Sequence, residues 1–135
     1  MEIKISFPGG KRVDAELNGF IVRTDQPQKY GGSDSAPAPF SLFLASIGTC
    51  AGIYVLSFCE ERKIPIEGVY LVQRLGYGKR EDGKTFIDKI VVEIIVPPSF
   101  PERYHKALIK VVDQCAVKKA IMNPPKFEIM TLVKG

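Results

Sequence analysis

The chain has 135 residues, of which 45% are hydrophobic and 25% are charged, and its formal net charge is +4. This composition is typical of a folded globular protein and excludes collagen-like and disordered classes. The length favours a single domain, residues 1–135, with one hydrophobic core. No aromatic residues alternate with the C-terminal lysines, so we expect a solvated basic face and no nucleic-acid partner.

The cysteine and histidine content limits the compartment and the chemistry. Three cysteines are an odd number and do not fit the disulfide framework of a small secreted protein. The first ten residues lack the apolar run of a signal peptide, so we predict a cytoplasmic protein. The single histidine, His105, excludes a histidine-based metal cluster, and the cysteines lack zinc-site spacing. We expect neither a metal nor an organic cofactor.

The N-terminal third alternates polar and apolar residues in three short segments. Asn18-Gly19 is a strong signal for a two-residue hairpin turn. We therefore predict a small antiparallel meander with strands at residues 2–7, 12–17 and 20–24. The segment from Gln26 to Pro39 is rich in Gly, Ser, Pro and Asp and is predicted to form a loop.

An uncharged run of 20 residues, from Phe40 to Cys59, follows this loop. It predicts a helix from Ser41 to Lys63 that ends before Pro65. The run is long enough to span a membrane, but serines and threonines dilute it, and the flanking strands need an apolar surface. We favour the central helix of a soluble protein, with a close crossing at its two glycines. Because a small chain cannot cover every side of such a helix, we expect a homodimer.

The C-terminal half predicts a long hairpin, a helix and a final strand. The hairpin strands are residues 69–78 and 85–96, and the last strand is residues 127–133. Ser99 and Glu102 have the spacing of a capping box, which predicts the start of the helix. An apolar stripe from Tyr104 to Cys115 follows, so Cys115 is predicted to face the core. The order of strands and helices indicates an α+β fold.

The cysteines are the candidate reactive groups. Cys50 and Cys59 are nine positions apart, so they lie on opposite faces of one helix and cannot pair. Cys50 and Cys115 lie on separate elements and could pair, although buried cysteines often act as small hydrophobic residues. A reactive thiol needs a lowered pKa. Because Cys50 lies well inside its own helix, we expect a nearby cation to lower it, and the candidates are Lys11, Arg12, Arg23 and Arg62.

Two segments resemble a known family. Pro39-Phe40-Ser41-Leu42-Phe43-Leu44-Ala45-Ser46-Ile47-Gly48-Thr49-Cys50 and the later Asp113-Gln114-Cys115-Ala116-Val117 resemble the two cysteine motifs of the osmotically inducible protein C and organic hydroperoxide resistance (OsmC/Ohr) family. The order of elements agrees over nearly the whole chain. The resemblance implies an OsmC-like fold, with antiparallel sheets packed on a long central helix in an intertwined homodimer.

The resemblance also implies a thiol-dependent peroxidase that protects against oxidative stress. Cys50 would attack an organic hydroperoxide, Cys115 would resolve the sulfenic acid as a disulfide, and an external dithiol would reduce it. Arg12 or Lys11 would stabilise the thiolate. The family's glutamate position falls on Phe40 or Ser41, which are not acidic. The alternative is therefore a non-catalytic dimeric binding or structural module with the same fold.

Overall fold

The computed structural model describes residues 1–135, which form two compact units, Met1–Ser46 and Ile47–Gly135. Helix α1 (Pro39–Glu61) contains the boundary between them. Its observed bounds lie within two residues of the predicted ones. The structure is a mixed α+β fold with two antiparallel sheets, as predicted. A single domain over residues 1–135 stays a prediction.

The first unit contains the predicted meander. Its strands are β1 (Lys4–Gly9), β2 (Arg12–Leu17) and β3 (Phe20–Thr24), which pair in the order β1-β2-β3. Asn18 and Gly19 both have positive φ, 48° and 82°, as a two-residue turn of type I′ requires. The hairpin signal therefore gave the correct turn.

A buried carboxylate organises the loop after β3. Asp25 is 1% exposed and accepts four hydrogen bonds, from the backbone N–H groups of Gln26, Ser33 and Ser35 and from the Ser35 hydroxyl. The Ser35 hydroxyl makes the largest contribution, and together these donors lower the pKa of Asp25 to about 2 against the opposing effect of burial. The predicted loop is thus an ordered segment, with one short 3-10 helix, η1 (Gln28–Tyr30).

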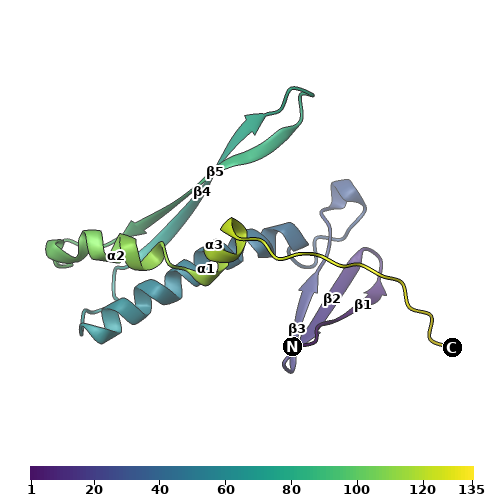
Figure 1. Ribbon diagram of the computed structural model, residues 1–135, viewed down its shortest axis with the longest axis horizontal. Helices are drawn as coiled ribbons and strands as arrows, with labels where there is room; N and C mark the ends of the chain where they lie inside the picture. Colours follow the sequence, from purple (N-terminus) through teal and green to yellow (C-terminus); the bar gives the residue numbers. More distant parts are fainter. The chain divides into compact units, whose positions relative to one another are not determined.

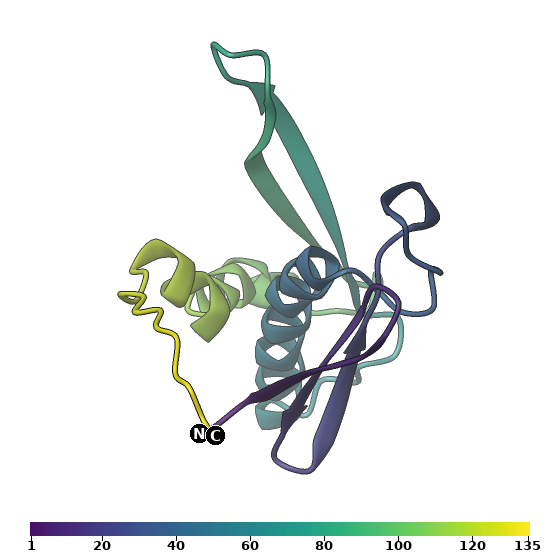
Figure 2. The same ribbon diagram turned by 90° about the vertical axis from the view of Figure 1, so that its right-hand side faces the viewer.

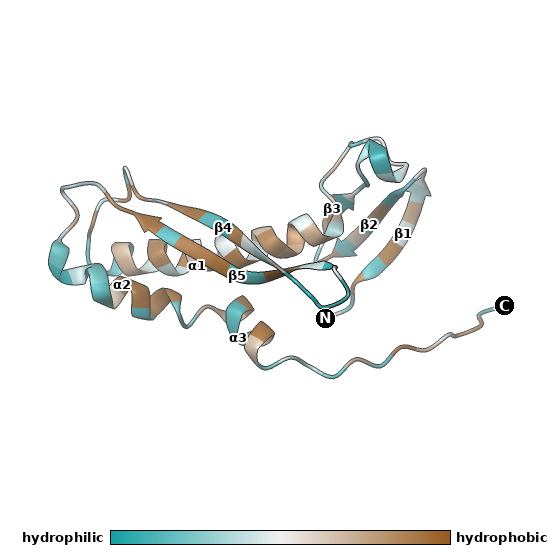
Figure 3. Ribbon diagram, turned by 90° about the horizontal axis from the view of Figure 1, so that it is seen from above, coloured by the Kyte–Doolittle hydropathy of each residue, from teal (hydrophilic) through white to brown (hydrophobic).

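The second unit contains the predicted hairpin and the hydrophobic core. Strands β4 (Tyr70–Lys79) and β5 (Thr85–Ile95) pair over their full length, and their turn end projects away from the helices (Figures 1 and 2). Apolar residues colour much of α1 and β5 in Figure 3. The core joins the end of α1 to the later helices and consists of Val55, Phe58, Cys59, Phe100 and Leu108.

The predicted C-terminal helix is broken in the structure. Residues 102–122 form η2 (Glu102–Tyr104), α2 (His105–Val112) and α3 (Ala116–Met122). The capping-box prediction is wrong, because η2 begins after Pro101 and has no side-chain cap. Cys115 adopts an extended backbone, with φ −54° and ψ 133°, and this separates α2 from α3. It is nevertheless 2% exposed, as the apolar stripe predicted.

The predicted final strand is absent. Residues 124–135 form neither helix nor strand, and Phe127, Ile129 and Val133 are 85%, 93% and 95% exposed. The alternation of this segment suits a strand, but a strand requires a neighbour that accepts and donates its backbone hydrogen bonds. The chain does not supply that neighbour itself.

Candidate functional site

Cys50 and Cys115 come together in the second unit. Cys50 lies on α1 and Cys115 immediately precedes α3, and both are free thiols. The Cys115 side chain and the backbone N–H groups of Val117 and Ala116 lie around the Cys50 sulfur and affect its ionisation. The two predicted site cysteines are therefore neighbours, although the chain separates them by two strands and a helix.

The groups around Cys50 favour its thiolate. The N–H of Val117 has the largest effect and lowers the pKa of the Cys50 thiol, and burial opposes it. The Cys115 side chain and the N–H of Ala116 lower the pKa further. The first N–H groups of a helix have no partner within the helix and carry its positive partial charge. A hydrogen bond to the charged form of an acid favours ionisation, so the net result is a lowered pKa.

Backbone N–H groups of a second helix, α3, thus contribute to the lowered pKa of Cys50. We predicted that the N-terminus of its own helix, α1, would offer Cys50 little, because Cys50 lies well inside α1. The prediction missed α3, whose first turn meets Cys50 across the unit. No Gly or Pro separates Val112 from Ala116, so the sequence carries no strong signal for the helix break that creates this N-terminus.

Cys59 is a core residue and lies apart from this pair. It is 0% exposed and packs in the cluster that contains Phe58 and Leu108. Burial raises the pKa of its thiol, and the positive charge of Arg62 only partly offsets this. Its position agrees with the helical phase, which put Cys50 and Cys59 on opposite faces. Arg62, a candidate partner of Cys50, lies instead over the ring of Phe58, 3.7 Å from its centre.

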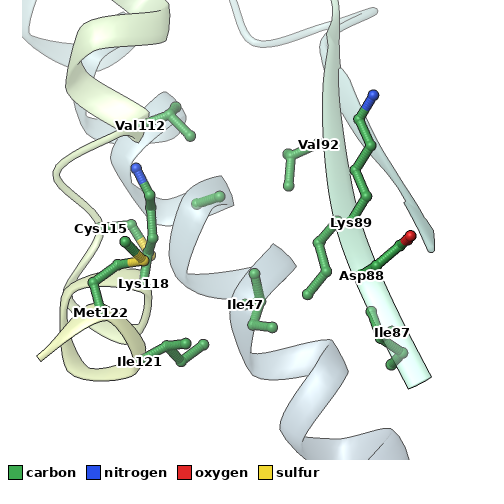
Figure 4. Close-up of a pocket in the computed structure, with 12 residues that line it drawn as sticks. Ile47, Ile87, Asp88, Lys89, Val92, Val112, Cys115, Lys118, Ile121 and Met122 are labelled. Atoms are coloured by element: carbon green, nitrogen blue, oxygen red, sulfur yellow. The ribbon is translucent and has the colours of Figure 1, made fainter. Parts of the chain in front are cut away.

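An apolar cavity of about 320 Å³ adjoins Cys115. Figure 4 shows Cys115 with Lys118, Ile121 and Met122 on one side of it, the β5 residues on the other, and Ile47 of α1 between them. Lys118 pairs with Asp113 across the break that contains Cys115. A mostly apolar cavity with a few polar groups is the usual form of a small-molecule site. This cavity has that form, and Cys115 lies in its wall.

Lys11 and Arg12 belong to the first unit. Both are exposed at the start of β2, and the Arg12 Nε donates a hydrogen bond to the Gly9 carbonyl at 3.4 Å. Together with Ser33 and Ser35 they line an open cavity of about 350 Å³. Asp25 fixes the serine side of this cavity through the hydrogen bonds described above. An action of Lys11 or Arg12 on Cys50 stays a prediction, and so does one of Arg23, which lies on β3.

The family model for OsmC-like proteins matches residues 32–130, which include α1 and both cysteines. The chain belongs to the OsmC-like protein family. Among curated proteins, none matches it significantly.

Solved OsmC-like structures share the fold at low sequence identity. An OsmC-like protein from Mycoplasma pneumoniae is 16% identical, with a TM-score of 0.68 over 91% of this chain and 87% of that one. An organic hydroperoxide resistance protein OsmC from Legionella pneumophila is 19% identical, with a TM-score of 0.56 over 90% and 89%. One from Elizabethkingia anophelis is 21% identical, with a TM-score of 0.57 over 92% and 90%. The predicted OsmC-like fold is confirmed.

Proposed function

We propose that this OsmC-like protein is a thiol-dependent peroxidase that reduces organic hydroperoxides. The observation that carries the proposal is the set of donors around Cys50, namely the Cys115 thiol and the N–H groups of Ala116 and Val117. A lowered pKa increases the thiolate fraction, and the thiolate is the nucleophile. A second thiol beside the first can resolve the oxidised form before it is oxidised further.

The reaction has three balanced steps. The Cys50 thiolate attacks the distal oxygen of the hydroperoxide, so an S–O bond forms as the O–O bond breaks, and Cys50 becomes a sulfenic acid. The alkoxide that leaves takes one proton and is released as an alcohol. The Cys115 thiol condenses with this sulfenic acid, forms the disulfide and releases water. An external dithiol then reduces the disulfide by exchange and is itself oxidised to a disulfide. The apolar cavity beside Cys115 accommodates the alkyl or aryl group of the peroxide.

Lys11 and Arg12 have a supporting role in the proposal. A cation close to a thiolate lowers its pKa, and the resemblance assigns that task to this pair. Lys11→Gln and Arg12→Gln distinguish them. The variant that lacks the acting cation has a lower rate constant for Cys50 oxidation. If neither variant changes this rate constant, neither residue stabilises the Cys50 thiolate.

We propose that the protein is a homodimer in the cytoplasm. One helix, α1, is long and apolar enough to cross a membrane by length and composition, but the core helix of a soluble protein meets the same criteria. In the second unit Ile53 and Ile109 are 52% and 63% exposed, and β4 and β5 form a sheet of only two strands. A partner subunit would cover these residues and extend this sheet. A monomer in sedimentation at micromolar concentration would contradict the dimer.

The test mixes reduced protein with cumene hydroperoxide and follows peroxide loss and intact mass, with dithiothreitol as the reductant. We expect fast consumption and, without reductant, a loss of about 2 Da as the disulfide forms. Cys50→Ser abolishes both. Cys115→Ser leaves Cys50 as sulfinic or sulfonic acid, whereas Cys59→Ser is the matched control and cycles normally.

Two results would contradict the proposal. A wild-type protein that does not consume cumene hydroperoxide supports the non-catalytic dimeric module, for which the absence of an acid at Phe40 and Ser41 is the supporting observation. A Cys115→Ser protein that turns over many times without overoxidation removes Cys115 as the resolving thiol.

A further inference from the structure

A second cavity, of about 220 Å³, lies in the second unit beyond the C-terminal end of α1. Its walls come from three segments, residues 62–67, 97–101 and 103–104. Pro65, Pro97 and Pro101 all line it. Proline fixes the backbone φ angle, so these walls are stiff, and a stiff site loses little entropy when it binds a ligand.

Two arginines face the same aromatic ring at this cavity. The guanidinium carbon of Arg103 is 4.7 Å from the centre of the Tyr104 ring, and that of Arg62 is 5.7 Å from it. Arg62 is further fixed by the Phe58 ring at 3.7 Å and by a hydrogen bond from its Nη1 to the Phe58 carbonyl. Stacking orients a guanidinium and leaves its edge free for an oxyanion.

A lysine occupies a strained backbone position at the same cavity. Lys63 has φ +54° and lies two residues beyond the end of α1. The hydrogen bonds from Lys63 N to the Glu60 carbonyl and from Ile64 N to the Cys59 carbonyl form a Schellman motif. Glycine is the preferred residue at this position, because it has no Cβ to clash there. A lysine here therefore has a conformational cost, and strain of this kind is common at functional sites.

The charges of the cavity do not balance. Its lining includes three cations, Arg62, Lys63 and Arg103, and only one carboxylate, that of Glu67. Lys63 and Arg103 have no ion pair, and Arg62 has a single one, at 3.6 Å to the exposed Glu61. We propose that this cavity is a binding site for a small organic oxyanion, with a phosphate or carboxylate group held by Arg62, Lys63 and Arg103.

The aromatic wall defines the rest of the ligand. Phe100 is 5% exposed and lines the cavity next to Tyr104. These rings provide an apolar surface beside the cations, so a ligand with an aromatic or aliphatic part gains affinity over inorganic phosphate. The site lies at the C-terminal end of α1 and contains neither Cys50 nor Cys115. The proposal is therefore independent of the peroxidase reaction.

The experiment is an NMR titration of the reduced, full-length protein at constant ionic strength, with inorganic phosphate, phenyl phosphate and benzoate in separate arms. We expect saturable shifts of backbone amides in residues 62–67 and 97–104 with at least one organic anion, and the tighter one identifies the preferred group. Lys63→Gln and Arg103→Gln each weaken this binding about fivefold or more. Lys84→Gln, which removes an equal charge from the hairpin turn, leaves it unchanged.

A further variant separates binding from stability. Lys63→Gly removes the charge and the strained conformation together, so it raises Tm and still weakens binding. If this more stable protein no longer binds the anion saturably, the loss of binding is not due to unfolding, and Lys63 belongs to the binding site. The proposal is overturned if no arm saturates, if Lys63→Gln and Lys63→Gly bind as the wild type does, or if Lys84→Gln weakens binding as much as they do.

Discussion

Two glycines on α1, one turn apart, are expected to respond differently to the same substitution. A Cβ added at Gly48 would lie 2.8 Å from the Gln73 Oε1, whereas one added at Gly52 would meet nothing within 4 Å. A helical glycine costs about 1 kcal/mol relative to alanine. Gly52→Ala should therefore raise the free energy of unfolding by about 1 kcal/mol, or Tm by about 3–5 °C for a chain of this size.

Gly48→Ala should gain the same stability from helix propensity, but a second effect should cancel this gain. The Gln73 amide must move away from the new Cβ, and displacement of a half-buried polar group costs about 1 kcal/mol. The net change is therefore within about 0.5 kcal/mol of zero. Urea denaturation of both reduced variants, with unchanged m-values, measures the difference.

Equal gains in the two variants would refute the close approach of β4 to α1 at Gly48. A Gly52→Ala protein that is less stable than the wild type would refute the open space at Gly52. Another surface, such as one of a partner subunit, would then pack there. Sedimentation of the same variant distinguishes a weakened dimer from a destabilised monomer.

Three further substitutions or conditions test the rest of the fold. Because folding lowers the pKa of Asp25, the ionised carboxylate stabilises the protein above pH 3.8, and this stabilisation disappears as the pH falls toward 2. The Tm difference between wild type and Asp25→Asn should therefore narrow between pH 3.8 and pH 2. Leu108→Ala, at a side chain that is 2% exposed in the core, should cost about 2–5 kcal/mol in urea denaturation. Cys59, with a raised pKa and no exposure, should react with iodoacetamide more slowly than Cys50 in the native protein, as measured by peptide mass spectrometry.

Local signals predicted most of the fold. The bounds of β2 and β3 were correct to the residue, because Asn18-Gly19 fixes the turn between them. The start and end of α1 were close because a proline lies at each side of the uncharged run. The break between α2 and α3 was missed, since no Gly or Pro marks it. The last strand was predicted from alternation alone, which shows that a segment can pair but not whether a neighbour exists.

The candidate site was less predictable, because it depends on contacts between distant segments. Helical phase separated Cys59 from Cys50, and the resemblance singled out Cys115. Neither could show that the N–H groups of Ala116 and Val117 reach the Cys50 sulfur. That contact depends on the helix break and on the packing of α2 against α1, and both are tertiary features.

The groups that lower the pKa of Cys50 do not depend on the acid that is missing at Phe40 and Ser41. The interactions that lower the pKa of Cys50 come from Cys115, Ala116 and Val117, and all three lie in the second unit. They are a thiol and two neutral backbone groups, so they need no carboxylate at Phe40 or Ser41 to orient them. The folded backbone holds these N–H groups in place. The non-acidic residues at 40 and 41 are therefore compatible with a reactive Cys50 thiolate.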